Sequence, residues 1–141
     1  MHRIFIAFAA ATVLFSYCSD RKSKNTEESP IKFTSLSPSQ TNITFDNKIT
    51  EDDSVNLIYN AYAYMGSGVG IGDFNNDGLQ DVFFGANQES CKLYLNKGNL
   101  SFEDITEKAG LNTSSWVTGV SIVDINADGF DDIYLCVSYY G

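Results

Sequence analysis

Histidine is almost missing from this chain of 141 residues, and basic side chains are scarce. The one histidine is His2, so the body of the chain has no imidazole for a catalytic triad, a proton shuttle or a zinc site. Lys and Arg total 9 against 18 Asp and Glu, and they form no cluster. Because nucleic-acid phosphates are bound by clustered Lys and Arg, we expect no nucleic-acid partner. Catalysis by carboxylates alone, as in glycoside hydrolysis, is compatible with this composition. We nevertheless expect a protein that is not an enzyme.

Cysteine is also sparse, with Cys18, Cys91 and Cys136 as its three positions. Cys91 and Cys136 fall on expected strands but not at equivalent places of the repeat described below. Because connectivity cannot be deduced from sequence, both a disulfide and two separate thiols are open. We favour two partly buried thiols.

Long apolar runs are few, and the notable one extends from Ile4 to Phe15. It follows a short basic start and is too short for a membrane span of about 20 residues, so it predicts a secretory signal peptide over 1–17. Cys18 follows at once, in a setting similar to the lipobox of bacterial lipoproteins. That similarity implies lipidation of Cys18, attachment to the membrane through the lipid, and export to the bacterial cell envelope, in particular the outer membrane. The alternative is an ordinary signal peptide with an incidental cysteine.

Residues 18–30 contain no large apolar side chain after the cysteine and mix both charges, which predicts a flexible tether. Apolar residues return from Ile31. We expect 31–54 to form lead-in strands or an extended segment, and 55–141 to form the main folded part.

The most informative pattern is a loop that occurs twice, as DFNNDGLQD at 73–81 and DINADGFDD at 124–132. Oxygen-bearing side chains stand at loop positions 1, 3, 5 and 9, glycine at 6 permits a sharp turn, and position 7 offers a backbone carbonyl. Calcium requires six to eight such oxygens. The loops therefore predict two Ca²⁺ sites, with ligands from Asp73, Asn75, Asp77, Leu79 and Asp81, and from Asp124, Asn126, Asp128, Phe130 and Asp132.

The residues that follow each loop exclude an EF-hand, which needs a glutamate at position 12 where this chain has Phe84 and Leu135. Short runs rich in β-branched and aromatic residues flank both loops and predict strands. We expect strands near 68–73, 81–86, 92–96 and 101–105. Four antiparallel strands in a repeat of about 50 residues are typical of a propeller blade.

Three segments carry a family resemblance: GVGIGDFNNDGLQD at 68–81, FFGAN at 83–87 and GVSIVDINADGFDD at 119–132. They resemble the FG-GAP or VCBS repeat proteins, whose repeats build calcium-binding β-propellers that also occur in integrin α-subunits. Residues 93–111 are similar to bacterial relatives of cartilage acidic protein, which carry an ASPIC/UnbV module after the propeller. The resemblance covers about residues 55 to 141 and implies the same metal ligands.

The expected fold is therefore all-β, with blades of four antiparallel strands and Asp-rich calcium loops. Closing a propeller takes about 4 to 8 blades, and this chain supplies about two, so we expect an incomplete propeller. Either the chain is the N-terminal piece of a longer protein or several chains assemble, and we favour the first.

Two functions fit these features. The first is a cell-envelope module for adhesion or for binding an unknown protein or glycan ligand. The second is the N-terminal scaffold of an envelope polysaccharide-degrading enzyme. Tyr62, Tyr64 and Trp116 could stack on sugar rings, but we interpret them as packing residues between blades.

Overall fold

The computed structural model describes residues 33–138, and its strands and helix lie in a compact unit that begins at Ser35. The predicted signal peptide, Cys18 and the tether fall outside the described residues. The described part contains six strands and one short helix, which confirms the all-β prediction. Over the same residues, no helix is long and apolar enough to cross a membrane.

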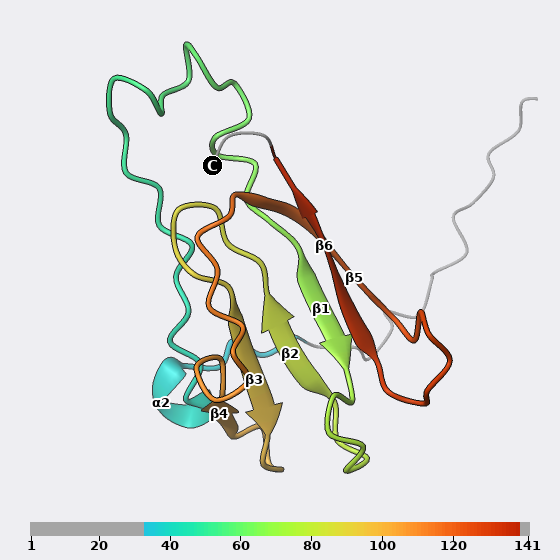
Figure 1. The fold of residues 1–141 in the computed structure, drawn as a ribbon. Helices are drawn as coiled ribbons and strands as arrows, with labels where there is room; N and C mark the ends of the chain where they lie inside the picture. The colour runs from blue at the N-terminus through green and yellow to red at the C-terminus, as the bar shows by residue number, and fades with distance from the viewer. Residues whose placement is uncertain (1–32, 139–141) are drawn as a thin grey trace, which may run out of the picture. The chain divides into compact units, whose positions relative to one another are not determined.

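Four strands form the first sheet, paired antiparallel in chain order (Figure 1). They are β1 (Val69–Gly72), β2 (Asp81–Phe84), β3 (Lys92–Asn96) and β4 (Phe102–Asp104). The turn between β3 and β4 uses positive φ at Gly98 (84°) and Asn99 (52°), as the turn-forming residues in this segment predict. The predicted four-stranded blade is thus confirmed, although β1, β2 and β4 are shorter than expected.

The second repeat contributes a hairpin of β5 (Val117–Val123) and β6 (Asp132–Val137). Its pairing reproduces that of the first hairpin at the offset of the sequence repeat. Ile71 pairs with Val82 in β1–β2, and the equivalent Ile122 pairs with Ile133 in β5–β6. The sequence repeat is therefore also a repeat of backbone register. In the described residues the second blade consists of these two strands alone.

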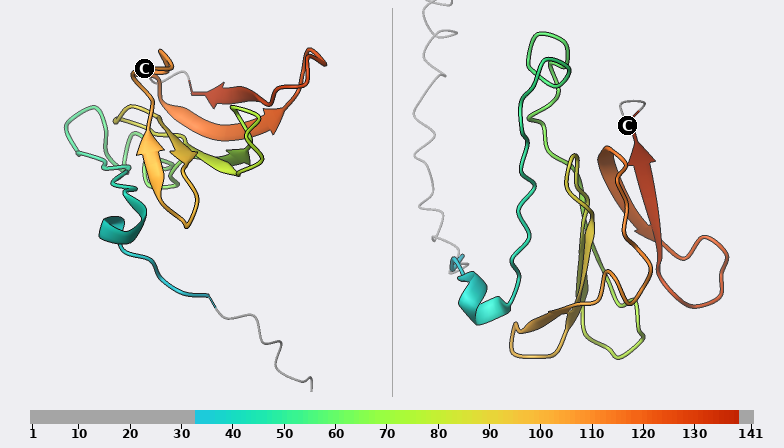
Figure 2. Two further views of the ribbon diagram at one scale, coloured as in Figure 1. Left: turned by 90° about the horizontal axis from the view of Figure 1, so that it is seen from below. Right: turned by 60° about the vertical axis from the view of Figure 1, so that its left-hand side comes forward.

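Glycines on one face of β1 let the hairpin approach closely. A Cβ built on Gly68 would lie 2.5 Å from the backbone nitrogen of Val120, and one on Gly70 would lie 2.5 Å from Cδ1 of Ile122. Side chains cannot fit at such distances, so the row of glycines at alternate positions sets the spacing between the layers. Figure 2 shows the hairpin against one side of the sheet and residues 43–50 against the other.

The core lies between the sheet and the hairpin. It consists of Phe83, Ala86, Cys91, Leu93 and Val117, all buried. Full burial of a side chain such as Phe, Leu or Val stabilises the fold by roughly 1.5–3 kcal/mol. Because the cluster joins Val117 of the second repeat to residues of the first, it is the main apolar link between the two repeats.

Of the two forms expected for the lead-in, strands or an extended segment, the strands are wrong, since its described residues form none. It begins with the short helix α2 (Pro38–Thr41), which ends at Asn42 in a left-handed conformation with φ 61°. The chain then runs extended, and the Phe45 ring stacks on Phe84 with centroids 4.9 Å apart. The segment is attached by side chains rather than by a backbone ladder, as when the Asn47 amide donates to Asn87 Oδ1 at 2.7 Å.

Three further expectations differ from the structure. Tyr62 and Tyr64 are 72% and 54% exposed, so they are not packing residues in this chain, whereas Trp116 is buried as expected. Cys91 and Cys136 are both free thiols. Cys91 is fully buried rather than partly buried, and Cys136 is exposed because β6 is an edge strand whose outer face has no neighbour among the described residues.

We predict that Gly68→Ala destabilises the fold by about 1–3 kcal/mol, because its methyl group would meet the backbone of Val120 and force the layers apart. Urea unfolding followed by circular dichroism measures this change in the free energy of unfolding.

Gly119→Ala is the matched control at the equivalent position of the second repeat. A Cβ there lies 3.6 Å from Cβ of Cys136, an ordinary contact. Its free energy of unfolding should stay within about 1 kcal/mol of the wild type. Equal losses in the two variants would contradict the role assigned to the close β1–β5 contact.

Candidate functional site

The two Asp-rich loops adopt the same backbone conformation. Asn76 and Gly78 have φ of 56° and 85°, and the equivalent Ala127 and Gly129 have φ of 60° and 89°. The glycine at loop position 6 suits this left-handed turn, since only glycine adopts it without steric cost. Each loop thus curls back on itself between two antiparallel strands.

The first carboxylate of each loop holds the turn by accepting backbone N–H groups. Asp73 accepts from Asp77 at 3.0 Å and from Gly78 at 2.8 Å. Asp124 accepts from Asp128 at 3.1 Å and from Gly129 at 2.9 Å. The same bonds join equivalent residues of both loops, so the repeat extends to side-chain geometry.

The remaining side chains of the two loops also correspond. The amides at position 3 donate to the carboxylates at position 5, Asn75 to Asp77 at 2.9 Å and Asn126 to Asp128 at 3.0 Å. Those carboxylates in turn accept the backbone N–H groups at position 7, from Leu79 at 2.8 Å and Phe130 at 2.9 Å. All ten predicted ligand residues therefore lie in two curled, hydrogen-bonded loops.

Asp81, at loop position 9, has the most buried carboxylate of the predicted ligands. It is fully buried, and its two oxygens accept the backbone N–H of Phe74 at 3.1 Å and of Asn96 at 2.8 Å. Burial raises the pKa of Asp81, and the charges of Asp77 and Asp73 raise it further, while the two N–H groups act in the opposite direction. Asp132 accepts the equivalent bond from Ile125 at 3.0 Å.

The loops also contact each other, which the sequence did not predict. The Asn76 amide donates to the carbonyl of Gly129 at 3.2 Å, and the Asp131 carboxylate accepts the backbone N–H of Asp73 at 3.2 Å. Figure 1 shows both loops at the same end of the molecule, one after β1 and one after β5. Asp131 is an acidic residue at loop position 8, and its link to the other loop arises only from the packing of β5 on β1.

The donors in these loops suit calcium by their chemistry. They are carboxylate, amide and carbonyl oxygens without nitrogen or sulfur ligands, as a hard cation prefers. Over residues 33–138, however, no group of three or more His, Cys, Asp or Glu side chains is gathered closely enough to be a metal site.

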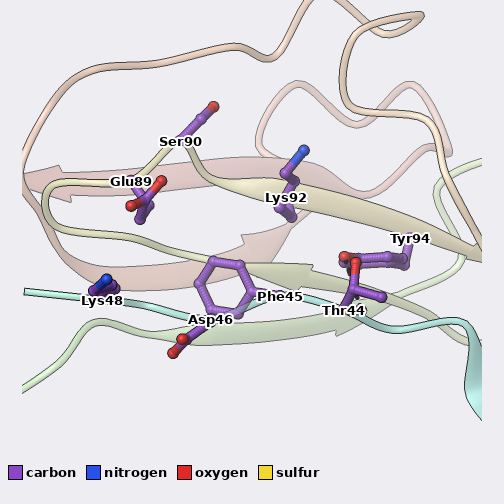
Figure 3. Close-up of a pocket in the computed structure, with 8 residues that line it drawn as sticks. All are labelled: Thr44, Phe45, Asp46, Lys48, Glu89, Ser90, Lys92 and Tyr94. Carbon is purple, nitrogen blue, oxygen red and sulfur yellow. Dashed lines mark hydrogen bonds between the residues drawn. The ribbon is translucent and has the colours of Figure 1, made fainter. Parts of the chain in front are cut away.

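A pocket of about 390 Å³ lies on the opposite side of the first sheet from the hairpin, where the lead-in crosses it (Figure 3). The Phe45 ring occupies its centre, with Lys48, Glu89 and Lys92 around it. Lys92 is paired with Asp104 at 3.0 Å, and this hydrogen bond raises the pKa of Lys92. The other lining residues are Thr44, Asp46, Ser90 and Tyr94.

A second hollow, of about 440 Å³, has a more apolar lining that includes Tyr62, Met65 and Trp116. Asn60 and Thr118 add an amide and a hydroxyl group. The sequence indicates packing or sugar-stacking roles for Tyr62 and Trp116, but it does not predict that the two side chains lie close together. Their meeting depends on the packing of the two repeats.

Comparison with known proteins supports the repeat that contains the two Asp-rich loops. Residues 73–135 match the FG-GAP-like repeat family. Integrin alpha-3 of Cricetulus griseus and of Mus musculus are each 34% identical over 91 residues, which is 56% of this chain and 9% of the relative. The chain thus spans less than a tenth of the length of these curated relatives. No solved structure gives a significant match. The sequence match and the all-β fold together support an FG-GAP repeat protein, with the family similarity lying in residues 73–135.

Proposed function

We propose that this chain is a calcium-binding FG-GAP/VCBS repeat module of an exported cell-envelope lipoprotein, which acts in adhesion or ligand binding. The observation that carries the proposal is the matched hydrogen bonding of the two Asp-rich loops. Two loops with oxygen donors at the same positions and the same backbone turn are expected to take the same cation. The envelope assignment rests on the signal peptide predicted over 1–17 and on Cys18 after it, and the resemblance of residues 93–111 to cartilage-acidic-protein-like lipoproteins (ASPIC/UnbV) belongs to the same proposal.

Calcium would act here as a structural ion. Seven of the 18 acidic residues lie at 73–81 and 124–132, and the two loops touch each other. The charge of a divalent ion offsets the mutual repulsion of these carboxylates and fixes the end of the blade. The residues that would hold it are the five oxygen donors of each loop.

A binding function rather than catalysis is supported by the side chains available. The chain has no histidine beyond His2, and the carboxylates of the two loops are assigned in this proposal to the cation. The pocket around Phe45 and the hollow lined by Tyr62 and Trp116 provide surfaces for a protein or glycan ligand.

We predict that Asp77→Asn and Asp128→Asn each weaken calcium binding at one of two sites by at least about tenfold, because each removes one ligand charge from an exposed loop. Isothermal titration calorimetry with calcium, and with magnesium as the competing ion, measures the stoichiometry and both affinities.

Asp131→Asn is the matched control, since it removes the same charge from the second loop at a position outside the predicted ligand set. The asparagine Oδ1 can still accept the N–H of Asp73. Calcium affinity should therefore change little. A wild-type chain that binds no calcium, or three variants with one common affinity, would refute the ligand assignment.

We predict that Cys18→Ala releases the protein from the membrane fraction and leaves its fold intact, because the thioether-linked lipid is the proposed anchor. Metabolic labelling with a fatty acid, followed by fractionation, measures both lipidation and retention. Cys136→Ala removes an exposed thiol from the folded part and should keep the label and the membrane location. Retention of the Cys18 variant in the membrane would rule out the lipid anchor.

A further inference from the structure

The hollow lined by Tyr62, Met65 and Trp116 is built from both repeats. One wall is the chain that leads into β1, and the other consists of residues at the start of β5 and just after β6. Trp116 is only 7% exposed, whereas Tyr62 and Met65 are 72% and 74% exposed. The hollow therefore combines a buried indole ring with an exposed phenol ring and thioether.

Hydrogen bonds hold both walls of the hollow in place. On the first wall, Asn60 Oδ1 accepts the backbone N–H of Tyr62 at 3.1 Å, and the Met65 N–H donates to the carbonyl of Tyr62 at 3.1 Å. On the second wall, the Ser138 N–H donates to the carbonyl of Trp116 at 2.9 Å. Because these segments are already ordered, a ligand binds without the entropic cost of ordering them.

The polar groups of the lining carry no charge. They are the amide of Asn60 and the hydroxyls of Thr118 and Ser138. None of the seven described residues that line the hollow is charged, although the chain has 18 Asp and Glu and 9 Lys and Arg. A charged ligand would lose hydration in this hollow without gaining a counter-charge. The lining therefore favours an uncharged ligand.

Aromatic rings beside amide and hydroxyl groups match a sugar ring better than an apolar peptide. A neutral pyranose has a face of C–H groups, which suits the electron-rich face of the Tyr62 ring, and hydroxyls at its edge that donate and accept hydrogen bonds. An apolar peptide side chain would leave the amide and hydroxyls of the lining without partners, which costs free energy. The volume of about 440 Å³ lies within the range of small-ligand sites.

We propose that this hollow binds a neutral sugar ring of a glycan, with Tyr62 as the stacking residue and with the Asn60 amide and Thr118 hydroxyl as polar contacts. The site rests on the ligand-binding function proposed above, and it narrows the ligand to an uncharged glycan. No residue of the two acidic loops lines the hollow, so sugar binding and calcium binding are measured separately.

Trp116 is the only tryptophan of the chain, so tryptophan fluorescence reports on this hollow alone. The full chain with Cys18→Ala is titrated, in the presence of calcium, with neutral hexasaccharides of glucose, mannose, galactose and N-acetylglucosamine. A hexasaccharide of galacturonic acid is the charged probe, and a neutral hexapeptide of leucine and phenylalanine is the apolar probe. We expect at least one neutral sugar to shift the tryptophan emission to saturation, and the charged and apolar probes to leave it unchanged.

Tyr62→Ala should weaken binding of that sugar at least about threefold, because it removes the stacking ring, whereas Tyr62→Phe keeps the ring and should keep the affinity. Tyr59→Ala is the matched control, since Tyr59 is 74% exposed in the same segment but does not line the hollow. Its sugar affinity should equal that of the wild type. Circular dichroism establishes that each variant is folded.

Three results would overturn the sugar site: no response to any neutral sugar, a stronger response to the charged or apolar probe, or equal affinities in Tyr62→Ala and the wild type. Calorimetry with calcium on the same sample tests the proposed calcium module independently. A chain that binds calcium but no neutral sugar overturns the sugar site alone. A chain that binds sugar but no calcium contradicts the calcium assignment and supports the sugar site.

Discussion

The close approach of β5 to the glycine face of β1 is the contact on which the rest of the structure depends. Hydrogen atoms in place of side chains at Gly68 and Gly70 let Val120 and Ile122 come against the first sheet. This approach closes the core around Phe83 and Val117. Because interiors are packed as densely as organic crystals, an added methyl group at the backbone contact would displace the whole hairpin. The four-stranded sheet and the hairpin thereby form one packed unit.

The same contact brings the acidic loops together. Each loop follows the first strand of its repeat, and both hairpins have the same register, so packing β5 on β1 places both loops at one end. Asp131 then reaches the backbone N–H of Asp73, and Asn76 reaches the carbonyl of Gly129. The concentration of negative charge there is a consequence of blade packing.

The two repeats are equivalent in sequence and register but not in environment. In the first, Phe45 covers Phe84 and leaves β1 open. In the second, the first sheet covers Val120 and Ile122, while Tyr134 is exposed. A stacked array leaves an apolar face at each end unless a further unit or a cap covers it. The exposure of these residues therefore reflects their place in the stack.

The sequence by itself determined the loops, the strands that flank them and the repeat that relates them. These features are local, since glycine position, oxygen-bearing side chains and apolar alternation act within a short stretch of chain. Tertiary structure decided the features that depend on distant partners. The extended lead-in was held against the first sheet by contacts such as the bond from Asn47 to Asn87 and the stacking of Phe45 on Phe84. Tyr62 was left exposed, Cys91 was buried and Asp131 was joined to the other loop because burial is set by neighbours that lie far along the chain.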